Sequence, residues 1–165
     1  GELIFQIGAS SSCINASEYL ANVVGVNRSP APQFDLEEEG KLHACLREVA
    51  QKNLACASHD VADGGLFVTL LEMAMPRGLG FDIVTDDEVR LDGFLFGEAQ
   101  GRAIVSLKEA DQDDFFDVCD AHGIRPTLLG HVTKGKLVVD DKHFGFCEEL
   151  RAYYDNALEE AMTEE

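Results

Sequence analysis

The sequence has few basic residues, no long apolar run and no beginning typical of a secreted protein. It carries 13 Lys and Arg against 31 Asp and Glu, a formal net charge of −18 at pH 7, which opposes broad electrostatic attraction to nucleic acid or to an anionic membrane. No apolar stretch approaches the about 18 residues of a membrane-spanning helix, and no basic segment precedes an apolar one at the start. We therefore expect a cytoplasmic protein without nucleic-acid or membrane partners.

Paired cysteines are also lacking. The five cysteines are an odd number and none forms a C-x-x-C pair, which argues against a structural zinc site and against a disulfide framework. Cys45 and Cys56 have apolar neighbours, so both are predicted as small core residues. His122, His131 and His143 share no metal-ligand spacing, and each is predicted to be structural.

The length and the order of apolar patterns predict one layered domain. A chain of 165 residues with 45% hydrophobic content can bury one sizeable core, so residues 1–165 are expected to form a single domain. Strands are expected at residues 2–7, 54–58, 81–84, 103–107, 127–132 and 136–139. Helices are expected at residues 17–24, 35–53, 66–75, 91–96, 109–121 and 148–162. The last two strands flank Lys134-Gly135 and predict a hairpin. This alternation is typical of an α/β fold in which helices layer a mixed sheet.

Residues 58–65, Ser-His-Asp-Val-Ala-Asp-Gly-Gly, are the stretch around which the rest is organised. The pattern predicts the end of a strand, a tight polar turn and the first turn of an apolar helix, where backbone N–H groups can bind an anion. Asp60 and Asp63 would repel that anion unless a hard cation such as Mg²⁺ lay between them. One interpretation is therefore a metal–phosphate site formed by Asp60, Asp63, Gly64 and Gly65. The alternative is that the two aspartates only cap the helix.

A second polar block, residues 97–102, immediately precedes the strand at 103–107. Its Glu98, Gln100 and Arg102 are punctuated by glycines, and such a group could hydrogen-bond a polar ligand. The three residues could equally form an internal salt bridge, and the residues alone favour that interpretation because Arg pairs readily with carboxylates.

The two blocks together resemble a known enzyme family. Residues 59–66, followed by Glu72-Met73, are similar to the H-D-x-S-D-G-G-L…E-M signature of phosphoribosylformylglycinamidine synthase, a relative of aminoimidazole ribonucleotide synthetase. Residues 95–102 resemble its L-F-S-E-S-Q-S-R block, and residues 1–5 and 17–20 resemble the start of the same carboxy-terminal domain. The resemblance implies a three-layer α/β/α fold with a mixed sheet, like the carboxy-terminal domain of aminoimidazole ribonucleotide synthetase.

The resemblance also implies an activity for the parent enzyme. The family converts formylglycinamide ribonucleotide to formylglycinamidine ribonucleotide in purine biosynthesis, with ATP and with ammonia derived from glutamine. Each synthase has two ATP-binding copies, and this chain resembles the carboxy-terminal domain of the second. Asp60 is then implied as a Mg²⁺ ligand beside an auxiliary ATP or ADP, and Glu98, Gln100 and Arg102 as substrate contacts. The implied partners are the remaining synthase domains, a glutaminase domain or subunit, and the ribonucleotide substrate.

The chain departs from the family pattern in both blocks. Ala62 stands where the signature has Ser, which removes a hydroxyl that could contact the nucleotide, and Ala99 replaces the Ser of E-S-Q. Because the family's catalytic residues lie in an ATP-binding domain that this sequence lacks, no catalytic residue is predicted, and a fragment that is inactive alone is expected. The alternatives are a non-catalytic scaffold or nucleotide-holding domain, and a domain of a selenophosphate- or thiamine-phosphate-type enzyme. Residues 95–102 argue against the last of these.

Overall fold

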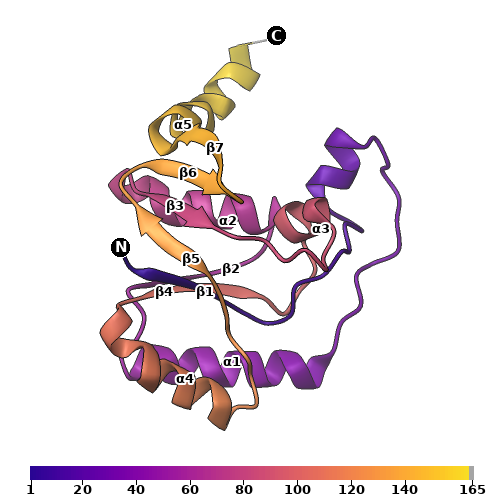
Figure 1. Cartoon of the computed structure of the whole chain (residues 1–165). Helices are drawn as coiled ribbons and strands as arrows, with labels where there is room; N and C mark the ends of the chain where they lie inside the picture. Colours follow the sequence, from indigo (N-terminus) through magenta and orange to yellow (C-terminus); the bar gives the residue numbers. More distant parts are fainter. Residues whose placement is uncertain (164–165) are drawn as a thin grey trace.

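The computed structural model describes residues 1–163, in which one seven-stranded sheet lies between layers of helices (Figure 1). The strands are β1 (Leu3–Ile7), β2 (Ala57–Asp60), β3 (Gly80–Ile83), β4 (Ala103–Leu107), β5 (Thr127–Thr133), β6 (Lys136–Val139) and β7 (Lys142–Phe146). The helices are α1 (Leu36–Gln51), α2 (Gly65–Ala74), α3 (Leu91–Phe96), α4 (Gln112–Ala121) and α5 (Cys147–Thr163). Short helical turns occupy Tyr19–Val23, Met75–Arg77 and Glu109–Asp111.

The strand order is β2-β4-β1-β5-β3-β6-β7, and the sheet is mixed because β3 and β6 are parallel while the other neighbours are antiparallel. Helices α1 and α4 cover one face, and α2 and α3 cover the other (Figure 1). The predicted three-layer α/β/α fold is confirmed. None of the helices within residues 1–163 combines the length and the apolar character needed to cross a lipid bilayer.

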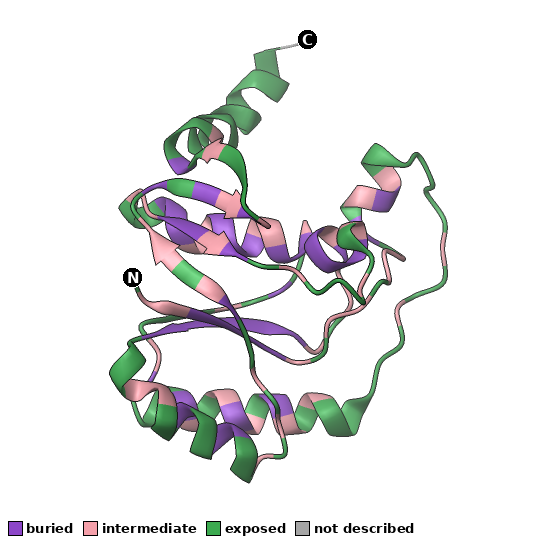
Figure 2. Cartoon of the chain, viewed as in Figure 1, coloured by how far each residue is buried: buried purple, intermediate pink, exposed green. Residues whose placement is uncertain are grey.

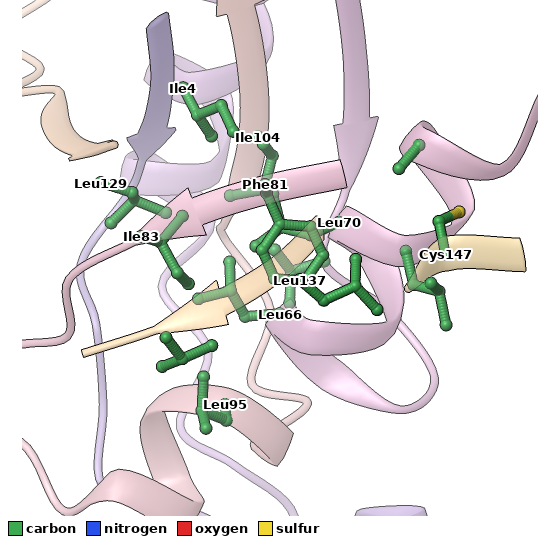
Figure 3. Packing of buried hydrophobic residues seen from close by; sticks show 14 of the residues in the cluster. Ile4, Leu66, Leu70, Phe81, Ile83, Leu95, Ile104, Leu129, Leu137 and Cys147 are labelled. Carbon is green, nitrogen blue, oxygen red and sulfur yellow. The ribbon is translucent and has the colours of Figure 1, made fainter. Parts of the chain in front are cut away.

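The hydrophobic core consists of two clusters, one on each face of the sheet, because successive side chains of the central strands point to opposite faces. In β1, Phe5 and Ile7 pack under α1 and α4, whereas Ile4 belongs to the cluster under α2, as expected when successive side chains point to opposite faces. Figure 2 shows the buried residues concentrated between the layers. Figure 3 shows Leu66 and Leu70 of α2 beside the side chains of β3 and β6. The two-sided burial explains why β1 and β4 are largely apolar on both faces.

Local signals placed most elements correctly. Asp35 before an amphipathic run predicts an N-cap, and the structure confirms it, because the Asp35 carboxylate accepts hydrogen bonds from the backbone N–H groups of Glu37 and Glu38 at 2.9 and 3.1 Å. The strand predicted at 54–58 begins later, at Ala57, so His59 and Asp60 belong to β2 rather than to the turn. The sequence did not predict β7.

The predicted hairpin of β5 and β6 is wrong. The two strands are joined through Lys134-Gly135 but do not pair with each other, because β3 lies between them, antiparallel to β5 and parallel to β6. Phe81 of β3 is fully buried there. Inserting β3 satisfies its backbone on both edges and buries its side chains, which outweighs the local preference for a hairpin.

Two burial predictions also need correction. Cys56 is exposed rather than part of the core, because it precedes the edge strand β2, which is paired on one side only. The hydrophobic pattern of residues 109–121 predicts Phe115 and Phe116 on the buried face of α4, but Phe116 is 37% exposed, whereas Phe115 is fully buried. Cys45 is fully buried, as predicted.

Candidate functional site

Residues of the two polar blocks line one cleft of about 390 Å³. The residues around it are Ala16, Pro32, Glu39, Asp60, Val61, Ala62, Asp63, Glu98, Gln100, Gly101 and Arg102. The blocks meet because β2 pairs with β4, which sets Asp60 opposite Ala103, and because Val61 N–H donates to the Arg102 carbonyl at 3.0 Å. Five of the seven predicted site residues therefore share this cleft: Asp60, Asp63, Glu98, Gln100 and Arg102.

The two glycines shape the junction between the blocks. Gly64 and Gly65 have φ angles of +81° and +73°, in the left-handed region that favours glycine. A Cβ on Gly65 would lie 2.7 Å from the Leu95 carbonyl oxygen. The absence of that Cβ lets the start of α2 pack directly on the backbone of α3. The glycines thus bring the second block beside the first.

The amides of the two glycines are already hydrogen-bonded. Gly64 N–H donates to Glu98 Oε1 at 2.8 Å, and Gly65 N–H donates to the Ala62 carbonyl at 3.0 Å. The expectation of free N–H groups at these two positions is therefore not met in this structure. The acceptor at Gly64 is a carboxylate of the second block, and the acceptor at Gly65 is a carbonyl of the turn itself.

Glu98 joins three segments that are distant in sequence. Besides Gly64 N–H, its Oε1 accepts a hydrogen bond from the Glu18 backbone N–H at 2.9 Å. Sequence reasoning chose Glu98 as a ligand contact or as a salt-bridge partner and missed this role. The only local signal is the acidic residue after Gly97, and it does not reveal which amides the carboxylate reaches.

Arg102 lies at the base of the cleft with little exposure. The residue is 3% exposed, and its guanidinium donates through Nε to the Ala99 carbonyl and through Nη2 to the Gly97 carbonyl. Within residues 1–163, Arg102 Nη1 has no hydrogen-bond partner and the side chain forms no salt bridge. Burial lowers the pKa of the guanidinium from its usual value. The internal salt bridge favoured from the residues alone is therefore wrong, and Arg102 Nη1 is a buried donor without a partner among the described residues.

The capping interpretation of the two aspartates is also wrong. The residue that caps α2 is Gly64, and no side chain caps this helix start. Asp60 and Asp63 are exposed instead, and Asp60 Oδ1 lies 3.3 Å from His59 Nδ1. The two carboxylates are thus accessible to a ligand.

The acidic turn is not a ready-made metal centre. Among residues 1–163 no group of three or more His, Cys, Asp or Glu side chains could hold a metal ion. Mg²⁺ in nucleotide sites is commonly held by one or two carboxylates together with phosphate oxygens and water. Asp60 and Asp63 fit that donor set, with the remaining oxygens supplied by a bound phosphate and by solvent.

The cleft also includes a residue that the sequence analysis passed over. Glu39, in the first turn of α1, lines the cleft, although the sequence pattern explains an acidic residue there by the helix dipole alone. The carboxylate also contacts His43 Nε2 at 3.1 Å. No local pattern could have placed Glu39 near Asp60, since α1 and β2 meet the cleft only through the packing of the layers.

The architecture defines a class of domain, namely a three-layer α/β/α unit whose edge strand leads into an acidic, glycine-rich helix start. The family model described as "AIR synthase related protein, C-terminal domain" matches residues 1–142. The chain belongs to this family. The matched residues include both polar blocks of the cleft.

Relatives in sequence carry one enzyme name. The chain is similar to "Phosphoribosylformylglycinamidine synthase subunit PurL" of Moorella thermoacetica, with 36% identity over 139 residues, which is 84% of this chain and 19% of the relative. A protein of the same name from Salinibacter ruber is 34% identical over 99% of this chain and 23% of its own length. The chain thus spans about a fifth of the curated relatives it matches.

Solved structures share the fold. The Thermotoga maritima PurL complexed with FGAR superposes with a TM-score of 0.74 and 14% identity, covering 91% of this chain and 28% of that one. A thiamine-monophosphate kinase from Stenotrophomonas maltophilia has a TM-score of 0.58 and 18% identity, over 86% of this chain and 51% of that one. At these identities the likeness concerns the fold alone.

Proposed function

We propose that residues 1–165 are the carboxy-terminal domain of the second synthetase-like copy in a phosphoribosylformylglycinamidine synthase. This enzyme is the ATP-dependent ligase of purine biosynthesis that forms formylglycinamidine ribonucleotide from formylglycinamide ribonucleotide and glutamine-derived ammonia. The observation that carries the proposal is the convergence of both family-like blocks on one cleft. The curated relatives of the same name add support over most of the chain.

The proposed ligand of the cleft is ATP or ADP with Mg²⁺. Four carboxylates line the cleft, namely those of Glu39, Asp60, Asp63 and Glu98, so a phosphate group needs a cation between itself and the aspartates. Asp60 and Asp63 would hold that cation, and the positive charge of Arg102, whose Nη1 is buried, would act on the anionic oxygens from below the cleft surface. Synthase structures from T. maritima that share this fold are complexed with ATP and with ADP, which supports a nucleotide.

Gly64 and Gly65 take part in this proposal through their backbone. A phosphate at the start of α2 would compete with the Glu98 carboxylate for Gly64 N–H, because that amide already donates to Glu98. Gln100 is exposed at the rim and is proposed, with Glu98, to contact a polar substrate group. The site is thus half of a binding surface that other domains of the synthase complete.

The proposed partners are the remaining synthase domains and a glutaminase domain or subunit, in a cytoplasmic enzyme. We expect the chain alone to be inactive, because none of its cleft residues has a catalytic role in this proposal. The purified chain is to be incubated with ATP, ammonia and formylglycinamide ribonucleotide, and product followed by mass spectrometry. ATP-dependent amidine formation above a no-protein control would contradict this expectation.

A scaffold without a ligand is the second candidate, and one observation favours it. Glu98 and Arg102 both make hydrogen bonds within the chain, so these polar residues contribute to folding whether or not a nucleotide binds. The domain would then serve the synthase only by packing against its neighbours.

Calorimetric titration of ADP, with and without Mg²⁺, distinguishes the two candidates. We expect Mg²⁺-dependent binding that Asp60→Asn weakens about tenfold or more, because the variant loses the negative charge facing the cation. Asp87→Asn is the matched control, since Asp87 is exposed, lies outside the cleft and loses the same charge. Binding that Asp60→Asn and Asp87→Asn leave equally intact would favour the scaffold. If the chain alone does not bind ADP, the same two variants in the full-length synthase separate a scaffold from half of a site.

A further inference from the structure

Two cysteine side chains meet between α1 and α4, and neither of them lines the cleft. Cys45 Sγ and Cys119 Sγ lie 3.7 Å apart, and both residues are fully buried. They belong to the core cluster that these helices form over β1 and β4, and Figure 1 shows α1 and α4 side by side. The two sulfurs are in contact although 74 residues separate them in sequence.

A second contact keeps the helices in register around the sulfur pair. Glu48 Oε2 lies 2.8 Å from His122 Nε2, and each of these residues follows its cysteine by three positions. Residues three apart lie on the same side of a helix. The polar contact therefore holds α1 and α4 in the arrangement that keeps the two sulfurs facing each other.

We propose that Cys45 and Cys119 form a redox-modification site, at which a hydroperoxide converts the two thiols into a disulfide that joins α1 to α4. A disulfide bond is about 2.0 Å long, so the sulfurs have to approach by about 1.7 Å. Rotation of the two short side chains can share that displacement. The other three cysteines, Cys13, Cys56 and Cys147, have no sulfur contact within residues 1–163.

The contact assigns different roles to the two sulfurs. The contact between the two sulfurs lowers the pKa of Cys45 and raises the pKa of Cys119. Cys45 is therefore the sulfur that gives the thiolate nucleophile, and because both residues are fully buried, the hydroperoxide reaches it when α1 and α4 separate transiently. The thiolate attacks one peroxide oxygen, the O–O bond breaks, and the leaving oxygen takes a proton to become water, which leaves Cys45 as a sulfenic acid.

The second step closes the bond. The Cys119 sulfur attacks the Cys45 sulfenic sulfur, the S–O bond breaks, and the hydroxyl leaves as water with the Cys119 proton. In total, two thiols and one hydrogen peroxide give one disulfide and two waters. The two sulfurs lose two electrons and the peroxide gains them.

Peptide mapping of the full chain after hydrogen peroxide treatment tests the proposal. We expect a linked peptide pair containing Cys45 and Cys119, about 2 Da lighter than the two free thiol peptides, that dithiothreitol separates. The melting temperature should rise by roughly 5–15 °C on oxidation and return on reduction, because the bond closes a long loop in the unfolded chain.

Two variants sharpen the result. Cys56→Ser removes the exposed cysteine and should keep the linked pair, whereas Cys119→Ala should abolish it. The proposal is overturned if Cys45 and Cys119 are both still alkylated as free thiols after a treatment that has oxidised Cys56. It is also overturned if Cys45 is linked to a different cysteine. Should Cys119→Ala fail to fold, the map of the unsubstituted chain decides by itself.

Discussion

The close approach of α2 to α3 makes Gly65→Ala the most informative stability variant. A methyl group on Gly65 would meet three backbone atoms, the Leu95 oxygen and two atoms of Phe96, each at 2.7 Å. Backbone atoms cannot move aside as the end of a flexible side chain can. The residue would also have to keep a φ of +73°, where a side chain is unfavourable by about 1–2 kcal/mol.

The close contact and the positive φ together should lower the stability of Gly65→Ala substantially. Overpacking of a close contact costs about 1–3 kcal/mol, so together with the backbone term we expect Gly65→Ala to lower the free energy of unfolding by about 2–5 kcal/mol. A domain of this size has about 5–15 kcal/mol in all. With a urea m-value of about 2 kcal/mol/M, the midpoint should fall by about 1–2.5 M.

Gly40→Ala is the matched control, because the same substitution should have the opposite sign there. Gly40 lies inside α1 and a Cβ on it meets nothing within 4 Å. The added methyl group should stabilise the helix by about 1 kcal/mol and raise the midpoint by about 0.5 M. A Gly65→Ala variant within about 1 kcal/mol of the unsubstituted chain would refute the account of the junction between the two blocks.

Two further predictions concern carboxylates. Glu98→Ala removes the acceptor of two backbone N–H groups and should lower the free energy of unfolding, measured by chemical denaturation, by about 2 kcal/mol. Glu98→Gln keeps an oxygen acceptor and should lower it by less than about 1 kcal/mol. Equal losses in the two variants would argue against a role for the hydrogen bonds. Hydrogen bonds from Lys52 and His122 lower the pKa of Glu48 in the folded chain. Glu48 therefore stabilises the fold at pH values above its unfolded pKa, which is near 4.5. This contribution is lost as the pH falls through the lower pKa of the folded state. The melting temperature of Glu48→Gln should therefore lie below that of the unsubstituted chain at about pH 6 and approach it at about pH 3; a constant gap would contradict this origin.

Much of the fold follows from local chemistry that the sequence displays. Asp35 before an amphipathic run predicts the start of α1, and Pro76 after an apolar run predicts the end of α2. Secondary-structure propensity, helix capping and hydrophobic periodicity depend on residues close together in the chain, so they can be recognised in a single sequence. The same local reading chose the two polar blocks, because charged residues among glycines beside an apolar helix or strand are conspicuous.

Other features depend on segments that meet only in the folded chain. Glu98 reaches Gly64 over 34 residues, Cys45 reaches Cys119 over 74, and β3 enters between β5 and β6. The sequence by itself determined most of the helices, strands and polar turns, since these depend on near neighbours, but not β7 or the start of β2. Only the tertiary structure decided that the blocks share a cleft and that the aspartates are free while Glu98 is engaged. The physical reason is that burial and hydrogen-bond satisfaction are settled over the whole sheet, where a non-local partner can outweigh a local preference.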